Sequence, residues 1–233
     1  MKVLISDYDK TFYTNEEDIK LNIKTTNEFM KKNMFIIATG RSYLDFEKQK
    51  KLYNIKYNYL IINHGATIVY NDKVIYNELI DNNILNKINN IVNKEKISNS
   101  FACNELESRL SLSTDKLTKI HVEYEKEENL NKVYKELLKF TDIINIYVMN
   151  NKKSLEIISQ RVNKANAINY LIEKNIIYKD DIYTIGDNYN DLEMLQIYNG
   201  ATMTNSINVL SNLNLKKYDT VSDYIIEIEK TTN

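Results

Sequence analysis

The stretch "LISDYDKTFYT", residues 4–14, decides the fold, because it carries an apolar run directly into two aspartates. The run at residues 2–6 is too short for a helix and suits a buried strand. Asp7 and Asp9 then stand two residues apart. A strand that enters a polar loop would explain the stretch, and so would a site where a carboxylate reacts beside a metal ion. The stretch alone leaves both interpretations open.

Composition limits the class of protein. The 233 residues carry 31 Lys plus Arg against 32 Asp plus Glu, so charge gives no general reason to expect nucleic acid or anionic membrane as a partner. Cys103 is the only cysteine, so no internal disulfide can form. The N-terminus lacks the apolar stretch of a signal peptide, and no window approaches about 18 uninterrupted apolar residues. We expect a cytoplasmic protein without a membrane partner, and its oligomeric state stays open.

The two ends of the chain share one pattern, in which short buried strands alternate with amphipathic helices. This alternation implies right-handed crossovers and a doubly wound, mostly parallel α/β sheet. Two alternating runs around Asn71-Asp72 predict a hairpin within it. The predicted strands are 2–6, 34–39, 59–63, 182–187 and 200–203, and the predicted helices are 15–32, 41–52, 164–175, 190–198 and 222–230.

The middle of the chain has a different pattern. Apolar and polar residues alternate at 118–124 and 144–149, and a further strand is predicted at 154–158. The alternation indicates a sheet with one solvated face and hence antiparallel pairing. Amphipathic helices are predicted at 82–95 and near 130–138. The expected domains are a catalytic core at 1–79 and 160–233, and an inserted α+β cap domain at 80–159.

Four polar pieces fall at predicted strand ends or helix starts of the core. In an open α/β sheet, ligands bind beyond the carboxyl ends of the strands, where the strand order reverses. We therefore expect these pieces at one edge of the sheet. They are "DYDKT" (7–11), "ATGR" (38–41), "NKANA" (163–167) and "GDNYND" (186–191).

The residue types in these pieces suit the transfer of a phosphoryl group to a carboxylate. Asp7 and Asp187 can supply the one or two carboxylates that Mg²⁺ prefers beside waters and substrate phosphate. The hydroxyl of Thr39 and the ammonium of Lys164 are suitable donors to the equatorial phosphate oxygens.

Two more aspartates have possible roles in the same chemistry. Asp9 shares a side with Asp7 if the strand persists, and it would protonate the leaving oxygen and then act as the base for water. Asp191 could anchor Lys164 or a metal-bound water.

In these motifs the chain resembles the haloacid dehalogenase (HAD) superfamily phosphatases, in the type IIB or Cof-like branch. The motifs occur in the family's order, and the insertion between the second and third matches the branch's cap position. The resemblance implies a HAD Rossmann-like core, Asp7 as nucleophile and Asp9 as acid/base. Mg²⁺ would then be held by Asp7, Asp187 and the backbone carbonyl of Asp9. The matching positions are Asp7, Asp9 and Thr11, then Thr39, then Lys164, then Gly186, Asp187, Asn190 and Asp191.

The remaining site residues are assigned with their alternatives. Gly40 is grouped with Thr39 in phosphate binding, while Thr11, Asn190 and Asp191 are given supporting roles. Arg41 is either a substrate contact or a solvated helix residue. His64 is either a substrate contact or a turn residue before Gly65.

The chain departs from the family pattern at two positions. Lys10 stands where the family usually has Gly, which questions the local turn and adds a cation near the phosphate. His64 occupies the usual Asn of a family "NGA" triplet. A substrate contact inferred from that Asn therefore has no direct counterpart here.

These observations favour a Mg²⁺-dependent phosphomonoesterase that acts through an aspartyl-phosphate on a small phosphorylated metabolite, such as a sugar phosphate. A phosphomutase of the same fold is an alternative, although the sequence shows no tight cluster of cap arginines for a second phosphate. A non-catalytic phosphate- or cation-binding module is another, but binding alone would not need both Asp7 and Asp9. We expect the cap to set substrate choice through a polar strand face at Lys119, His121 and Glu123.

Overall fold

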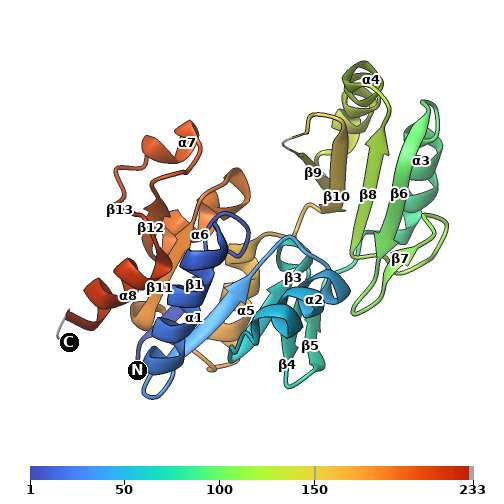
Figure 1. The fold of residues 1–233 in the computed structure, drawn as a ribbon. Coiled ribbons are helices and arrows are strands. Elements are labelled where there is room, and N and C mark those ends of the chain that lie inside the picture. Colours follow the sequence, from blue (N-terminus) through green and yellow to red (C-terminus); the bar gives the residue numbers. More distant parts are fainter. Residues whose placement is uncertain (150, 231–233) are drawn as a thin grey trace.

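The computed structural model describes residues 1–149 and 151–230. Its strands form two sheets, one of eight strands and one of five. Figure 1 shows the sheets as two lobes, with both chain termini on the larger lobe, away from the smaller one. The chain passes into the smaller lobe after β5 and returns after β10. The mixed α/β fold predicted from the sequence is thereby confirmed.

The larger sheet has the strand order β13-β12-β11-β1-β2-β3-β4-β5. Pairing is parallel from β13 to β3 and antiparallel for the last two strands. The predicted hairpin is the β4–β5 pair, whose turn residues Asn71 and Asp72 both have positive φ, as a two-residue hairpin turn requires. The strands are β1 (Val3–Ser6), β2 (Met34–Ala38), β3 (Tyr59–Ile62), β4 (Thr67–Tyr70), β5 (Lys73–Asn77), β11 (Ile182–Gly186), β12 (Asn199–Met203) and β13 (Lys217–Tyr218).

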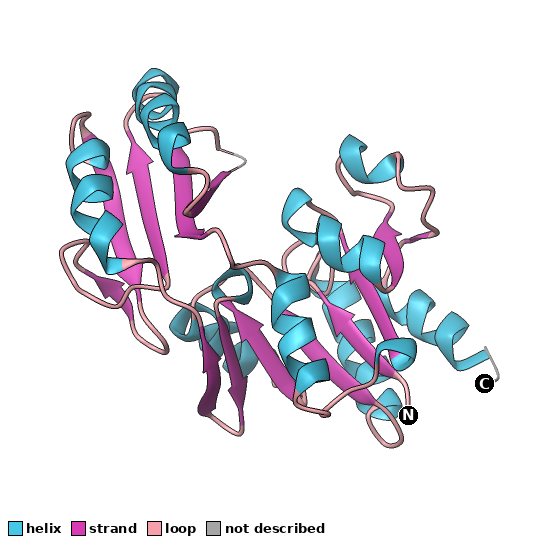
Figure 2. Ribbon diagram, turned by 180° about the vertical axis from the view of Figure 1, so that it is seen from behind, coloured by secondary structure: helices cyan, strands magenta, loops and turns pink. Residues whose placement is uncertain are grey.

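Helices cover both faces of this sheet (Figure 2). Side chains alternate across a strand, so Leu4 of β1 packs into one core cluster, while its neighbours Val3 and Ile5 pack into the other. This doubly covered sheet explains why its strands read as continuous apolar runs. One face carries α1 (Glu16–Phe29), α2 (Tyr43–Tyr53) and α8 (Val221–Lys230), and the other carries α5 (Lys164–Glu173), α6 (Leu192–Ile197) and α7 (Asn208–Ser211).

The smaller sheet is antiparallel, as the alternating pattern predicted, with the order β7-β6-β8-β10-β9. Two of its strands, β6 and β7, were not predicted, and neither were β13 and α7 of the larger lobe. The elements are α3 (Asn82–Val92), β6 (Ile97–Cys103), β7 (Ser108–Leu110), β8 (Lys119–Tyr124), α4 (Glu127–Leu137), β9 (Ile144–Val148) and β10 (Ser154–Ser159). We propose residues 80–159 as the cap, with 1–79 and 160–233 as the catalytic core.

The two faces of the cap sheet differ in character. Ile120 and Val122 of β8 pack with α3 and α4 in a third apolar cluster. Lys119 and His121 alternate with them and so lie on the opposite face, beside Glu156 of the neighbouring strand β10. The cap thus turns a charged surface toward the core.

Hydrogen bonds to N-cap side chains fix where two helices of the core begin. Asn163 accepts a hydrogen bond from the Asn166 backbone N–H and so starts α5 at Lys164. Ser42 caps α2 in the same way, which moves the start of that helix two residues beyond the predicted position 41. None of the helices in the described ranges is both long enough and apolar enough to cross a bilayer.

Candidate active site

The site lies where β1, β2 and β11 end side by side in parallel register. The loops after these strands line one wall of a cavity of about 430 Å³, and the charged face of the cap sheet lines the other. The four polar pieces predicted to share one sheet edge therefore do so. The lining includes Asp7, Asp9, Lys10, Gly40, Arg41, His64, Asp187 and Asn190 from the core, and Lys119, His121 and Glu156 from the cap.

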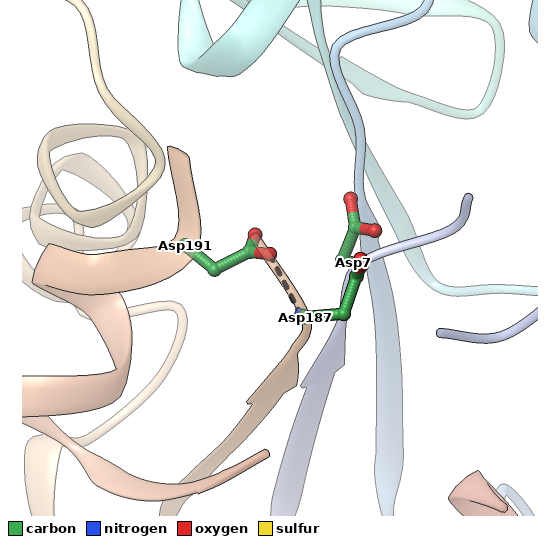
Figure 3. Close-up of side chains that lie close together, drawn as sticks. All are labelled: Asp7, Asp187 and Asp191. Carbon is green, nitrogen blue, oxygen red and sulfur yellow. Dashed lines mark hydrogen bonds between the residues drawn. The ribbon is translucent and has the colours of Figure 1, made fainter. Parts of the chain in front are cut away.

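An acidic cluster forms the floor of the cavity. Asp7, Asp187 and Asp191 are all buried, and their carboxylate oxygens lie within 4.8 Å of one another (Figure 3). The Lys164 ammonium donates to Asp7 Oδ1 at 2.5 Å and to Asp191 Oδ1 at 2.6 Å. One buried cation thus faces three carboxylates.

Asp191 is fully occupied by its neighbours. Its Oδ2 accepts the backbone N–H groups of Asp187 and Asn188, each at 3.0 Å. Its side chain lies under Gly186, where a Cβ would come within 2.5 Å of the Asp191 carboxyl carbon. The packing of Asp191 therefore leaves no room for a side chain at Gly186 of the fourth motif. Asp191 is in place to anchor Lys164.

The charges of this cluster fit a divalent cation. Burial raises the pKa of Asp7 well above its usual range, and the two neighbouring carboxylates raise it further against the opposing effect of Lys164. Burial, followed by repulsion from Asp191, also raises the pKa of Asp187 to about 6. Within the described residues, Oδ2 of Asp7 and Oδ2 of Asp187 accept no hydrogen bond. Two under-used carboxylates in an all-oxygen setting match the donor set of Mg²⁺.

Asp9 lies outside this cluster. Strand β1 ends at Ser6, so the alternation that would have placed Asp9 beside Asp7 does not continue. Instead, Asp9 accepts two hydrogen bonds from the Arg41 guanidinium, at 2.7 and 2.9 Å. Arg41 in turn lies over the Tyr8 ring, 5.2 Å from its centroid. Both Asp9 and Arg41 line the cavity, and Arg41 is ion-paired rather than simply solvated.

Lys10 preserves the turn that the family usually makes with glycine. Its φ is 63°, in the left-handed region that favours glycine. Its N–H donates to the Tyr13 carbonyl at 2.8 Å, and its own carbonyl accepts from the Asn205 side chain at 3.0 Å. The left-handed turn is therefore present without glycine, and it brings the lysine to the cavity rim.

The two threonines of the motifs are fully buried. The Thr11 hydroxyl donates to Asp187 Oδ1 at 2.9 Å and so orients a carboxylate of the acidic cluster. Thr39 follows the last residue of β2, and its Oγ1 accepts the backbone N–H of Arg41 at 3.1 Å. Between them lies Gly40, which lines the cavity.

His64 is both a turn residue and a part of the cavity wall. Its φ is 61°, and its buried ring lies between the core and the cap. Nε2 is 2.5 Å from Glu156 Oε2, Nδ1 is 3.3 Å from the Asn190 side-chain nitrogen, and the ring stacks on Tyr147.

Sequence reasoning missed Glu156. The signal was available, because Glu156 is the single charged residue in a strand whose other members are apolar or serine, and its neighbours Leu155 and Ile157 are fully buried. Lys119 of the predicted polar face is only 3% exposed, so it is not free to solvent.

Comparison with known proteins identifies the family. The model of the family described as sucrose-6F-phosphate phosphohydrolase matches residues 1–219. The chain belongs to this family of HAD phosphatases. A protein of Mycoplasma capricolum subsp. capricolum, described as uncharacterized, is 31% identical, over 84% of this chain and 88% of that protein.

Solved structures have the same HAD fold. A haloacid dehalogenase-like hydrolase from Bacteroides thetaiotaomicron has a TM-score of 0.82 at 18% identity, covering 97% of this chain and 99% of that one. The sucrose-phosphatase from Synechocystis, solved in complex with sucrose and phosphate, has a TM-score of 0.69 at 15% identity, with 98% of each chain covered. The chain thus belongs to the family of HAD phosphatases that the family model describes, and it shares the fold of these solved structures.

Proposed function

We propose that this HAD phosphatase is a Mg²⁺-dependent phosphomonoesterase that acts on a small phosphorylated metabolite. The substrate class that we propose is a sugar phosphate. The observation that carries the proposal is the position of Asp7. It directly follows the central strand β1, is held by Lys164 inside an acidic cluster, and lines a cavity between core and cap. The family name and the sucrose-phosphatase complex support a sugar phosphate as the substrate class.

In the first step, an oxygen of Asp7 attacks the phosphorus atom of the ester. The bond between phosphorus and the ester oxygen breaks, and the leaving oxygen takes a proton from the Asp9 carboxyl group. Asp9 has to release at least one of its hydrogen bonds to Arg41 for this transfer. The products are the free alcohol and a phosphoryl group on Asp7.

In the second step, the Asp9 carboxylate takes a proton from water as the water oxygen attacks the same phosphorus. The bond between phosphorus and Asp7 breaks, which releases phosphate and restores the Asp7 carboxylate. Lys164 and the hydroxyl of Thr39 would donate to the non-bridging phosphate oxygens, where negative charge is concentrated.

We propose that Asp7 and Asp187 hold the Mg²⁺, with the backbone carbonyl of Asp9 as the third ligand that the resemblance implies. The ion would neutralise negative charge on the phosphoryl oxygens and on the two carboxylates. The raised pKa values of Asp7 and Asp187 support this assignment, because burial and then the neighbouring carboxylates disfavour their negative charge, which a cation would offset.

The cap would act on the part of the substrate that does not react. Its wall of the cavity carries His121 and the Lys119–Glu156 ion pair, which offer both donors and acceptors to hydroxyl groups. A closed cap also excludes water from the first step.

The direct test is capture of the phosphoryl group on Asp7. The protein is mixed with Mg²⁺ and an aryl phosphate, quenched in acid, digested, and analysed by mass spectrometry for a phosphorylated Asp7 peptide. We expect the label in the wild type and in the exposed-site control Asp180→Asn, and none in Asp7→Asn or in excess chelator.

Turnover without a labelled Asp7 peptide, or full turnover in chelator, would contradict the proposal. Analysis of the released products separates the alternatives, because a phosphomutase yields an isomeric phosphate ester instead of free phosphate. A binding module yields neither product.

A further inference from the structure

A network of polar contacts joins the cap to the loops of the core. On the cap side, Glu156 accepts from His64 at 2.5 Å and from Lys119 at 3.0 Å. Lys119 then returns to the core, because its ammonium also donates to the backbone carbonyl of Gly40 at 2.6 Å. On the other side of the His64 imidazole, the side-chain nitrogen of Asn190 lies 3.3 Å from Nδ1.

The protonation states of the groups in this network are consistent with one another. Burial lowers the pKa of His64 against the opposing effect of Glu156, so the imidazole is neutral near pH 7. Its Nε2–H donates to Glu156, and its Nδ1 accepts from Asn190. Burial alone would raise the pKa of Glu156, but Lys119 and two histidines outweigh it and hold this pKa well below the usual range. Glu156 is therefore an anion paired with the Lys119 cation.

The groups of this network are tightly packed and have little room to move. A Cβ on Gly40 would lie 2.4 Å from the His64 ring, so only glycine lets the loop approach so closely. The backbone at His64 is left-handed and is flanked by positive φ at Asn63 and Gly65. Lys119 and Glu156 are only 3% and 6% exposed. By contrast, the ion pair that joins Arg109 of the cap to Asp45 of the core is long at 3.5 Å, and its arginine side chain is 55% exposed.

The contact with Gly40 fixes one peptide group from both ends. The Gly40 carbonyl and the Arg41 N–H belong to the same planar peptide, in which they point in opposite directions. Lys119 holds the carbonyl, and Oγ1 of Thr39 accepts the N–H. Because Oγ1 is an acceptor here, its own hydrogen must point elsewhere. It has no acceptor within the described residues, and Thr39 is fully buried.

We propose that Lys119 is a positioning residue for phosphoryl transfer. Through the Gly40–Arg41 peptide, this cap lysine sets the direction in which the Thr39 hydroxyl donates to the phosphate, and Glu156 and His64 hold Lys119 in place. The proposal rests on the proposed function, since it takes the phosphate as the acceptor. Cap closure then does more than cover the substrate, because it completes the donor set of the core.

The test is a double-mutant cycle between Lys119 and Thr39. Lys119→Met and Thr39→Val are made singly and together, with Lys132→Met as the matched control on the exposed side of the cap, where Lys132 pairs with Glu95. A small aryl phosphate is the substrate. Each single variant should lower kcat/KM by about 10- to 100-fold, as expected for one misplaced donor, while Lys132→Met stays within about twofold.

The double variant decides the question. If Lys119 acts through Thr39, the kcat/KM of the double variant should be no more than about threefold below that of the less active single variant. Thr39→Ser, which keeps the hydroxyl, should restore most of the activity and keep its sensitivity to Lys119→Met. The proposal would be overturned if the two substitutions lowered kcat/KM by factors that multiply in the double variant. It would also be overturned if the kcat/KM of Lys119→Met equalled that of Lys132→Met.

Two measures keep the test decisive. If Lys119→Met does not fold, Lys119→Met/Glu156→Gln replaces it, because this pair leaves no unpaired buried charge. The same cycle is also run on the affinity for inorganic phosphate, measured by calorimetry with Mg²⁺ present. A wild type that binds phosphate but turns over no ester would contradict the proposed function, while the affinity cycle would still decide the role of Lys119.

Discussion

Two buried charge clusters lie on opposite sides of the cavity, and they are balanced differently. The core cluster sets three carboxylates against Lys164, and burial raises the pKa of Asp7 and Asp187. The cluster between cap and core sets Glu156 against Lys119 and two histidines, and the pKa of Glu156 is lowered. Burial is similar in both places, so the number of carboxylates per lysine makes the difference.

This contrast separates two kinds of buried charge. A cluster with an uncompensated excess is unfavourable by itself and improves when a cation or a reacting group arrives. A cluster that is already neutral gains nothing from a further ion and serves to fix geometry. Function in the core cluster should therefore depend on metal, whereas function at the interface should depend on shape and hydrogen bonding.

The strongest way to break the core cluster is Asp7→Asn. The amide cannot attack phosphorus, so phosphate release from an aryl phosphate in Mg²⁺ should fall by at least about a thousand-fold. The melting temperature should not fall, because the change removes one of the excess negative charges. A variant that keeps about a tenth of the wild-type rate would rule out Asp7 as the nucleophile.

Lys164→Met should sharpen the contrast by removing the only cation of the core cluster among the described residues. The carboxylates it leaves behind should lower the free energy of unfolding by about 3 kcal/mol, measured by urea denaturation. Mg²⁺ should then raise the melting temperature of the variant by more than it raises that of the wild type. The exposed control Lys179→Met should behave as the wild type, and equal Mg²⁺ responses in all three proteins would refute the charge-excess explanation.

His121→Ala tests the interface cluster as a determinant of specificity. His121 lines the cavity and lies 3.4 Å from Glu156, but it does not reach the Gly40 loop. Removing one polar contact to a substrate hydroxyl should change the kcat/KM ranking of sugar phosphates by about tenfold. Hydrolysis of a small aryl phosphate should stay within about twofold. Equal losses on both substrate types would mean that this face does not set substrate choice.

The smallest expected effect is the pH dependence carried by His64. Because burial lowers its pKa below 6.5, the unfolded chain takes up a proton that the folded protein resists. The stability of the wild type relative to His64→Asn should therefore decline as pH falls below about 6.5, by no more than about 1.4 kcal/mol per pH unit. Urea denaturation at pH 7.5 and 5.5 measures this, since Asp187 titrates in both proteins and cancels. Parallel curves would mean that His64 takes up a proton as readily in the folded protein as in the unfolded chain, and that its pKa is not lowered.

The sequence predicted most of the fold because buried parallel strands appear as apolar runs. It missed β6, whose first half is polar and exposed, and β13, which has only two residues. The location of the site was predictable for a similar reason, since Asp7, Thr39 and Asp187 each follow or end a strand of one sheet.

Contacts between loops were not predictable. The pairing of Asp9 with Arg41 depends on where β1 ends, and the approach of Asp191 to Asp7 depends on a turn held by side-chain hydrogen bonds. The charge of Glu156 in an apolar strand marked it, but its contacts were not predictable, because its partners come from two other segments of the chain. Periodicity describes one segment at a time, and these contacts join several.

The order of strands has a consequence for how the protein is made. The central strand β1 is synthesised before the cap, yet one of its two neighbours in the sheet, β11, is synthesised after the cap. Thr11 and Asp187 are separated by 176 residues. The cap lies between them and is one continuous stretch, so on the ribosome it can collapse through its own contacts while the core still lacks three of its eight strands. The catalytic edge is thus assembled only after β11 has been synthesised, and a nascent chain that stops before β11 carries the proposed nucleophile without the rest of its acidic cluster.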